Sequence, residues 1–392
     1  MKKVAFVIHR CGENITGGAE THCLQLAKKM SKHWNVIILT TCASDYNSWE
    51  NEFSPGACEI DHVPAIRFSV NFKRDSEKFA KQSLKVLPNK NNNNLGSEDE
   101  WMKIQGPYSV DLIDHIETHS DNYDCFLFYC YLYATSYYCL PLVKEKSILM
   151  PLAHDEHAIY LRIFDVFFTH PKAFIFNTPE EKNFLKRRFP WVDFIGDSIA
   201  IGIDSQNRNI PNNNCFRLKY GIKKPYIIYS GRIVETKGCD ELLEFYQKLS
   251  PKIRTNLDLV LTGKSIMEIP KTEGIHYLGF LDEKDKSAAM ANAEWLIVPS
   301  IYESLSIVLL EGWLNRTPAI VHSDCEVTVG HCKRSNGGLW YKSFEEFQSL
   351  LKNVGAEQKL IMGQNGEKYV EKNYKWDVIE NKMIALMELF ER

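Results

Sequence analysis

Residues 294–322 read EWLIVPSIYESLSIVLLEGWLNRTPAIVH, and this stretch decides the fold. Two apolar runs of strand length, Glu294–Pro299 and Pro318–His322, flank a segment with the character of a helix at Ser304–Asn315. A strand, a helix and a second strand in this order form a βαβ unit, whose two strands lie parallel. The stretch therefore predicts a parallel sheet covered by helices.

The same alternation continues in both directions along the chain. In the first half, strands are expected at Val4–His9, Val36–Thr41, Cys125–Leu132, Ile148–Ala153 and Ala173–Asn177. In the second half, further strands are expected at Tyr226–Ser230 and Asp258–Thr262, with helices at Asp240–Leu249 and Lys284–Asn292. The pattern predicts an α/β protein with two Rossmann-like, doubly wound domains that face each other across a deep interdomain cleft.

The length of 392 residues also favours two domains, because one hydrophobic core rarely grows that large. The polar run at 205–214 interrupts the alternation and is the expected linker, between an N-terminal domain at 1–204 and a C-terminal domain at 215–374. Residues 375–392 are expected to form an amphipathic helix that packs back on the first domain. A second polar stretch, 87–100, is expected to be a mobile surface loop.

Composition excludes several classes of function. The formal net charge of −3 argues against a nucleic-acid partner. The eleven cysteines form no C-x-x-C pair, which favours reduced thiols in a cytoplasmic protein. No run of 18 apolar residues occurs, so an integral membrane protein is excluded, but peripheral attachment at the inner face of the cell membrane stays open.

Two acidic residues stand out in the stretch 294–322. Glu303 follows a strand at the edge where ligands bind in open α/β sheets, and Glu311 lies inside an apolar helix. Burial of Glu311 requires either a protein cation or ligand hydroxyls such as those of a ribose. The start of the helix offers unpaired backbone N–H groups to a diphosphate, at Ser304, Leu305, Ser306 and Ile307. The competing interpretation makes Glu303 an ordinary helix-terminal acid and Glu311 a solvated residue.

Two cations occupy a similar position after another expected strand. Arg232 and Lys237 lie in a loop bounded by Gly231 and Gly238, and glycine lets backbone approach a phosphate closely. Such a pair can neutralise a diphosphate leaving group. Taken alone, the two residues are equally compatible with solvated surface charges.

Together these segments resemble a known family. Gly231-Arg232-x₄-Lys237-Gly238, followed by Glu303-x₇-Glu311, resembles the retaining glycosyltransferase family 4, which has the two-domain GT-B fold. The resemblance implies transfer of a sugar from a nucleotide sugar with retention of configuration. It places Arg232 and Lys237 on the diphosphate, Glu303 on hydroxyls of the donor sugar and Glu311 on the ribose. It also makes the C-terminal domain the nucleotide-sugar domain and the N-terminal domain the acceptor side.

The first domain contains further matches. The turn at 16–20, with Gly17, Gly18 and Glu20, resembles the glycine-rich turn of the family near the donor phosphates and the acceptor. His154 matches an active-site histidine near the donor sugar, and Asp155 is a candidate to orient its ring. Without the resemblance, these are a tight turn with a helix-terminal acid and a structural histidine.

Several other positions are weaker candidates. Gly263, Lys264, Phe280 and Leu281 stand where the nucleotide base is expected, and the choice between UDP and GDP stays open. Tyr108 is an acceptor-side candidate on position alone. The segment 182–191 combines basic and aromatic residues, which suits either a contact with anionic lipid or an ordinary exposed helix end.

The chain contains no Asp-x-Asp motif, so we expect no metal and no other cofactor. Front-face attack is the preferred mechanism, because the first domain offers no obvious carboxylate nucleophile. We expect a hexose-type sugar and a glycan, lipid-linked or protein-linked acceptor, in bacterial surface polysaccharide or glycoconjugate synthesis; the oligomeric state stays open. The alternatives are a noncatalytic GT-B partner of another transferase and a sugar-nucleotide epimerase.

Overall fold

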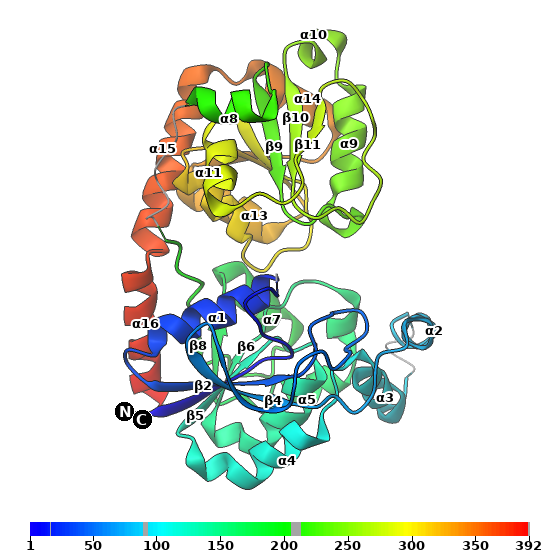
Figure 1. Ribbon diagram of the computed structural model, residues 1–392, viewed down its shortest axis with the longest axis vertical. Coiled ribbons are helices and arrows are strands. Elements are labelled where there is room, and N and C mark those ends of the chain that lie inside the picture. The colour runs from blue at the N-terminus through cyan, green and yellow to red at the C-terminus, as the bar shows by residue number, and fades with distance from the viewer. Residues whose placement is uncertain (16, 89–92, 205–212, 391–392) are drawn as a thin grey trace. The chain divides into compact units, whose positions relative to one another are not determined.

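A computed structural model describes the chain except for residues 16, 89–92, 205–212 and 391–392 (Figure 1). Contacts divide it into two compact units, of which the first comprises Met1–Ile201 and Ile379–Arg392, and the second Gly202–Val378. Most of the expected linker at 205–214 therefore falls outside the described residues, as do Thr16 and part of the polar stretch at 87–100.

The first unit is built on an eight-stranded sheet with the order β3-β4-β2-β1-β5-β6-β7-β8, in which all neighbours are parallel except β3 and β4. Its strands are β1 (Lys3–Val7), β2 (Asn35–Thr41), β3 (Gly56–Ile60), β4 (Val63–Phe68), β5 (Cys125–Tyr129), β6 (Ser147–Met150), β7 (Ala173–Phe176) and β8 (Gly196–Ser198). All side chains of β5, β6 and β7 are buried, as is typical of parallel strands with helices on both faces.

Helices cover both faces of this sheet, with α1 and α4 on opposite sides (Figure 1). They are α1 (Gly18–Met30), α2 (Ser76–Val86), α3 (Leu95–Gln105), α4 (Val110–His119), α5 (Ala134–Cys139), α6 (Ile163–Phe167), α7 (Pro179–Arg188) and most of α16 (Trp376–Phe390). Short 3₁₀ turns are η1 (Ser120–Asn122), η2 (Leu140–Lys146) and η3 (His157–Tyr160). Residues of α16 from Ile379 onward group with this unit.

The second unit contains a wholly parallel six-stranded sheet with the order β11-β10-β9-β12-β13-β14. Its strands are β9 (Tyr226–Ser230), β10 (Asp258–Thr262), β11 (Ile275–Tyr277), β12 (Trp295–Val298), β13 (Ala319–His322) and β14 (Gly338–Tyr341). Its helices are α8 (Asn213–Tyr220), α9 (Cys239–Lys248), α10 (Pro251–Arg254), α11 (Glu283–Ala291), α12 (Ile307–Leu314), α13 (Glu326–Ser335), α14 (Phe344–Asn353) and α15 (Ala356–Asn373), with a 3₁₀ turn at η5 (Glu235–Lys237).

In both sheets the order in which the chain adds strands reverses near the middle of the sheet, and the candidate site lies at these reversals. The chain builds the first sheet outward from β1 on one side and continues from β5 on the other. In the second sheet the reversal lies between β9 and β12. Because the loops on either side of such a point run apart, a crevice forms at the carboxyl ends of the two strands, and ligands bind there in open α/β sheets.

Two expectations about local structure were wrong. Residues 95–100, expected in a mobile loop, belong to α3, whose first turn is capped by the Asn94 side chain. Although this turn is polar in composition, one of its residues fixes it to the fold. The fully buried Glu98 carboxylate accepts hydrogen bonds from Ile163 N (3.0 Å) and from the Asn93 amide (3.3 Å). The helix expected from Ser304 begins instead at Ile307.

Strands β3 and β4 were not predicted from the sequence. β3 and β4 form a hairpin whose two-residue turn, Asp61 and His62, has positive φ angles of 48° and 67°, as the favoured tight hairpin turn requires. Four of the five β3 residues are exposed. An edge strand of this kind carries no apolar run, so periodicity does not reveal it.

Candidate functional site

Three loops of the second unit meet at the reversal of its sheet. They follow β9, β10 and β12, and two glycines bring them together. A Cβ atom on Gly238, at φ 71°, would lie 2.6 Å from the carbonyl oxygen of Pro299, and one on Gly263, at φ 125°, would lie 1.9 Å from that of Gly231. Only glycine fits at such distances, so the sequence permits these loops to touch.

The convergence places a cation beside a carboxylate. Lys237 Nζ lies 2.7 Å from Glu303 Oε1, and the two side chains are 30% and 15% exposed. Lys237 ends the 3₁₀ turn after β9, whereas Glu303 follows β12. Two residues for which the sequence analysis predicted separate contacts, with diphosphate and with sugar, thus form one partly desolvated ion pair.

Arg232 lies in the same loop, with an exposed side chain. Its backbone is held by the protein core, because the hydroxyl of the buried Tyr229 donates a hydrogen bond to the Arg232 carbonyl oxygen (2.7 Å). A rigid turn that carries an exposed guanidinium suits recognition of an anion, since Arg binds phosphate with a planar fork of donors.

The residues before α12 differ from the prediction in one respect. Ser304, Leu305 and Ser306 precede the helix, and only Ile307 lies in its first turn. Ser306 occupies the N-cap position of the helix at φ 63°, but its buried hydroxyl makes no capping hydrogen bond and has no hydrogen-bond partner among the described residues. Backbone strain of this kind often occurs at binding sites. The expected row of backbone N–H groups at Ser304–Ile307 is therefore interrupted, because Ser306 is left-handed and the helix begins only at Ile307.

A histidine that the sequence analysis missed supports this loop. Fully buried His331 of α13 donates from Nε2 to the carbonyl oxygen of Leu305 (3.1 Å), and its Nδ1 accepts from the Tyr369 hydroxyl (3.1 Å). Burial lowers the pKa of His331 to about 3, so the ring is neutral and keeps this donor and acceptor arrangement. No motif or spacing marks His331 in the sequence.

Glu311 forms an ion pair with a lysine of the protein, which is one of the two ways in which its burial was expected to be compensated. Lys286 Nζ of α11 lies 2.9 Å from Glu311 Oε1 and 2.9 Å from Glu283 Oε1. Burial raises the pKa of Glu311, and the lysine opposes that rise. Burial lowers the pKa of Lys286, but the two carboxylates outweigh it and leave the pKa raised. The carboxylate is held in place before any ligand arrives.

Of the residues expected beside the nucleotide base, Gly263 and Leu281 support the fold, whereas the side chains of Lys264 and Phe280 are exposed. Gly263 donates its N–H to the carbonyl of Gly279 (2.8 Å), which ties the loop after β10 to the one after β11. Lys264 and Phe280 are exposed, and the Phe280 ring is 74% accessible. Leu281 is a core residue at 5%, so its side chain supports the fold and only its backbone can face a ligand.

In the first unit, Gly17 occupies the N-cap position of α1 and Gly18 is the first residue of the helix. A Cβ atom on Gly17 would lie 2.2 Å from Glu20 Oε2, whereas one on Gly18 would meet open space. Gly17 therefore leaves room for the Glu20 carboxylate. Thr16, the remaining residue of the motif, lies outside the described residues.

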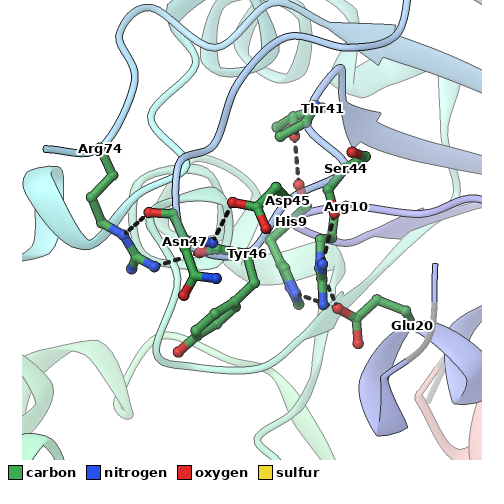
Figure 2. Close-up of polar contacts among 10 residues, drawn as sticks. His9, Arg10, Glu20, Thr41, Ser44, Asp45, Tyr46, Asn47 and Arg74 are labelled. Atoms are coloured by element: carbon green, nitrogen blue, oxygen red, sulfur yellow. Dashed lines mark hydrogen bonds and ion pairs between the residues drawn. The ribbon is translucent and has the colours of Figure 1, made fainter. Parts of the chain in front are cut away.

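The Glu20 carboxylate points into the protein (Figure 2). Its Oε1 accepts from Arg10 Nε (2.5 Å) and lies 3.2 Å from His9 Nε2. Burial alone would raise the pKa of Glu20, but His9 and Arg10 outweigh it and lower the pKa to about 2. Arg10 also donates to the carbonyl of Ser44 (2.7 Å). This geometry favours the interpretation made without the family resemblance, in which Glu20 is a helix-terminal acid at a tight turn.

His9, Arg10 and Tyr133 lie at the reversal of the first sheet, and the sequence analysis missed all three. The His9 ring stacks on Tyr133, with ring centroids 3.8 Å apart, and its Nδ1 has no hydrogen-bond partner among the described residues. Burial lowers the pKa of His9. One signal was available, because His9 and Arg10 directly follow a buried strand in the position that Arg232 occupies after β9.

His154 lies after β6, as expected for a residue at the carboxyl edge of the sheet. Its Nδ1 is 3.4 Å from Glu156 Oε1, and Glu156 also accepts from the Tyr131 hydroxyl (2.7 Å). Asp155, expected to orient His154, instead accepts from the Tyr160 hydroxyl (2.8 Å). The acid observed beside the imidazole is thus Glu156, one residue further along the chain.

Glu181 holds the backbone next to His154. Its Oε1 accepts from Ala153 N (2.7 Å) and its Oε2 from Asn177 N (2.6 Å), so one carboxyl group joins the loops after β6 and β7. Burial raises the pKa of Glu181 to about 8, although both backbone donors lower it. A buried acid bonded to two backbone groups is invisible in the sequence, where it appears as the first turn of a helix.

The remaining candidates lie elsewhere in the first unit. Tyr108 packs in an aromatic cluster, with ring centroids 6.0 Å from Phe72 and 5.2 Å from Tyr138. Within the segment 182–191, Phe189 is core, whereas Trp191 is 56% exposed. In the part of the chain that the structure describes, no group of His, Cys, Asp and Glu is placed to hold a metal ion, and no helix is long and apolar enough to cross a membrane.

Comparison with known proteins identifies the second unit. Residues 215–368, which include Arg232, Lys237, Glu303 and Glu311, match the family model described as "Glycosyl transferases group 1". This match covers most of the second unit. Two curated relatives agree. An uncharacterized glycosyltransferase of Methanocaldococcus jannaschii is 25% identical over 55% of this chain and 56% of its own length. A phosphatidyl-myo-inositol mannosyltransferase of Propionibacterium freudenreichii is 26% identical over 42% of this chain and 44% of its own.

The chain thus spans about half the length of the curated relatives it matches. Similarity in structure extends further than the glycosyltransferase domain. Anabaena HepE, solved in complex with UDP and glucose, superposes with a TM-score of 0.67 over 99% of this chain and 100% of that one, at 13% identity. At this identity the likeness concerns the fold alone. Both units therefore belong to the GT-B fold, as the motifs predicted.

Proposed function

We propose that the protein is a retaining glycosyltransferase that moves a hexose-type sugar from a UDP- or GDP-sugar to a glycan, lipid-linked or protein-linked acceptor. The observation that carries the proposal is the ion pair between Lys237 and Glu303 at the reversal of the second sheet. It lies inside the group 1 glycosyltransferase domain and beside the exposed Arg232. The two cations on these loops complement the negative diphosphate of a nucleotide sugar, and the carboxylate can accept hydrogen bonds from the sugar hydroxyls.

The chemistry follows from where charge develops. As the bond between the anomeric carbon and the phosphate oxygen breaks, negative charge grows on the diphosphate and positive charge on the sugar. Arg232 and Lys237 stabilise the first, and Glu303 accepts hydrogen bonds from the sugar hydroxyls. Glu311, fixed by Lys286, is assigned to the ribose. The departing phosphate takes the proton of the acceptor hydroxyl, so that front-face attack needs neither a carboxylate nucleophile nor a metal ion.

In the first unit, we assign His154 to the donor sugar, with Glu156 beside its ring. The acceptor side is assigned to the loops around Gly18 and Tyr133, at the reversal of the first sheet. Glu20 and Asp155 order these loops through their partners Arg10 and Tyr160. Synthesis of a bacterial surface polysaccharide or glycoconjugate, from the cytoplasmic side of the cell membrane, is the proposed setting.

Two alternatives share the same fold. A noncatalytic partner of another transferase needs no paired Lys237 and Glu303, and the presence of both disfavours it. A sugar-nucleotide epimerase would convert its substrate without transferring the sugar. The two enzymes differ in a measurable product, because only a transferase releases nucleoside diphosphate as the sugar moves to water or to an acceptor.

The deciding experiment incubates the purified protein with UDP-, GDP- and ADP-sugars and measures the slow release of nucleoside diphosphate. We expect release from one of the first two classes, with the anomeric configuration of the sugar retained. Isomerisation of the sugar while it stays attached to the nucleotide would identify an epimerase. Absence of both binding and release with every donor would support the noncatalytic alternative.

A further inference from the structure

A cavity of about 490 Å³ opens at the edge of the first sheet, away from the carboxyl-edge loops described above. Its walls are the residues around the start of β7, the edge strand β8 and one face of α16. This volume lies in the range of small-molecule sites, about 300–1,000 Å³.

The cavity is apolar because α16 carries a second apolar stripe. One stripe, which includes Ile379 and Met383, is buried in the first unit. The other includes the exposed Ala385 and Leu389 (63%), which line the cavity together with the buried Leu386. Ile195 on the opposite wall is 58% exposed. Large apolar side chains gathered around an opening mark a site for an apolar ligand rather than chance exposure.

Lysines surround this opening. Lys172 Nζ lies 4.5 Å from the centroid of the Phe390 ring, and Lys382 Nζ donates to the carbonyl of Ser198 (3.4 Å). Lys182, the first basic residue of the segment 182–191, donates to the carbonyl of Gly196 (2.6 Å). Asp197 is the one acidic residue among the described residues that line the cavity. Two lining cations, Lys172 and Lys382, with Lys182 bonded to the lining residue Gly196, make the rim attractive to a negative group.

We propose that this cavity binds an acyl chain of an anionic membrane lipid, with the lipid phosphate at Lys172 and Lys382. The apolar walls favour the chain by about 0.8 kcal/mol for each buried CH₂ group. The lysines extend their apolar stems along the walls and keep their charged ends at the rim, where lipid headgroups lie. The proposal does not depend on the reaction assigned above, because it concerns another face of the first unit.

The test is sedimentation of the full chain with vesicles of phosphatidylcholine alone or mixed with phosphatidylglycerol. Binding is expected to the mixed vesicles only. Lys172→Glu and Lys382→Glu should each weaken it about fivefold or more, from the worth of one basic residue at an anionic surface. Lys252→Glu changes the same charge on the exposed helix α10 and serves as the control. Equal loss in this control, or binding to both kinds of vesicle, would overturn the proposal.

A second measurement separates the cavity from mere surface attraction. Monomeric decanoate, followed by titration calorimetry, should bind with one equivalent per chain and lose its binding in Leu389→Asp. Leu360→Asp is the matched control, because Leu360 is an equally exposed leucine, at 57%, on α15. Both positions are exposed, so thermal unfolding should stay unchanged in each. Vesicle binding without decanoate binding would show an electrostatic surface and refute an acyl-chain cavity.

Discussion

The ammonium group of Lys237 lies 2.7 Å from the carboxylate of Glu303, although 66 positions separate the two residues in the chain. Strands β9 and β12 are parallel neighbours, with Trp295 opposite Ile227, so the loops that follow them begin side by side. Because the strand order reverses between β9 and β12, the pair lies at the position where ligands bind in open α/β sheets. The two sequence motifs that contain Lys237 and Glu303 are therefore joined in the fold by one ion pair.

The cations should matter for donor chemistry. Arg232→Ala and Lys237→Ala are each expected to lower kcat/KM for the donor by about 10²–10³-fold, roughly 2.7–4 kcal/mol, because each removes a charge that stabilises the leaving group. Donor hydrolysis at saturating and limiting donor concentrations measures the effect. Lys252→Ala, on the exposed helix α10, is the control and should retain full activity. Unchanged turnover in either site variant would rule out the assignment.

The pair should also behave as a unit. Glu303→Gln and Lys237→Met are each expected to impair donor hydrolysis, and the double variant should lose much less than the product of the two single losses. The reason is that either single change already disrupts the contact that positions both side chains. A double-mutant cycle on kcat/KM measures the coupling. Strict additivity would mean that the 2.7 Å contact has no part in the reaction.

Lys286 and Glu311 give a prediction about stability and binding. Lys286→Met leaves the Glu311 carboxylate without its cation and should cost about 2 kcal/mol of unfolding free energy, measured by urea denaturation. Glu311→Gln should instead raise KM for the donor with little change in kcat, as expected for a residue that contacts only the ribose. A fall in kcat without a change in KM would assign Glu311 to the reacting centre.

Glu181 predicts a pH dependence of stability. The folded-state pKa of about 8 lies above the value of 4.5 for an unperturbed glutamate, so the native state holds a proton that the unfolded state releases between these pH values. This group therefore favours the native state most below pH 4.5, and the contribution is lost as pH rises through 8. Glu181→Gln lacks this titration and leaves one backbone N–H without its acceptor. Its deficit in unfolding free energy relative to the natural protein should shrink from pH 5 to pH 8; a constant deficit would contradict the assigned pKa.

Metal removal tests the mechanism. Arg232 and Lys237 take the place of a divalent cation in the proposed reaction, so donor hydrolysis should be unchanged in an excess of chelator. The same assay with added Mg²⁺ or Mn²⁺ is the comparison. A strict requirement for either ion would show that the two side chains are insufficient to stabilise the diphosphate.

Much of the fold and part of the site were predictable from the sequence. Strands such as β9 and β10 are fully buried, and a continuous apolar run reveals them because every side chain must avoid water. Arg232 and Lys237 were found because glycines flank them. Glu181 and Lys286 were missed, since each acts on residues far away in the chain and looks locally like any charged residue of a helix.

The sequence by itself determined the alternation of strands and helices, the two-unit organisation and the match of residues 215–368 to the family model described as "Glycosyl transferases group 1". These follow from apolar periodicity and from short motifs, which are properties of neighbours in the chain. Only the tertiary structure decided that Lys237 pairs with Glu303, that Glu156 rather than Asp155 lies beside His154, and that Glu20 binds inward to Arg10. The order of strands in each sheet determines which loops lie side by side, and therefore which charged residues pair. Once a pair is buried, removal of one partner strongly destabilises the fold, because the other charge is left without compensation.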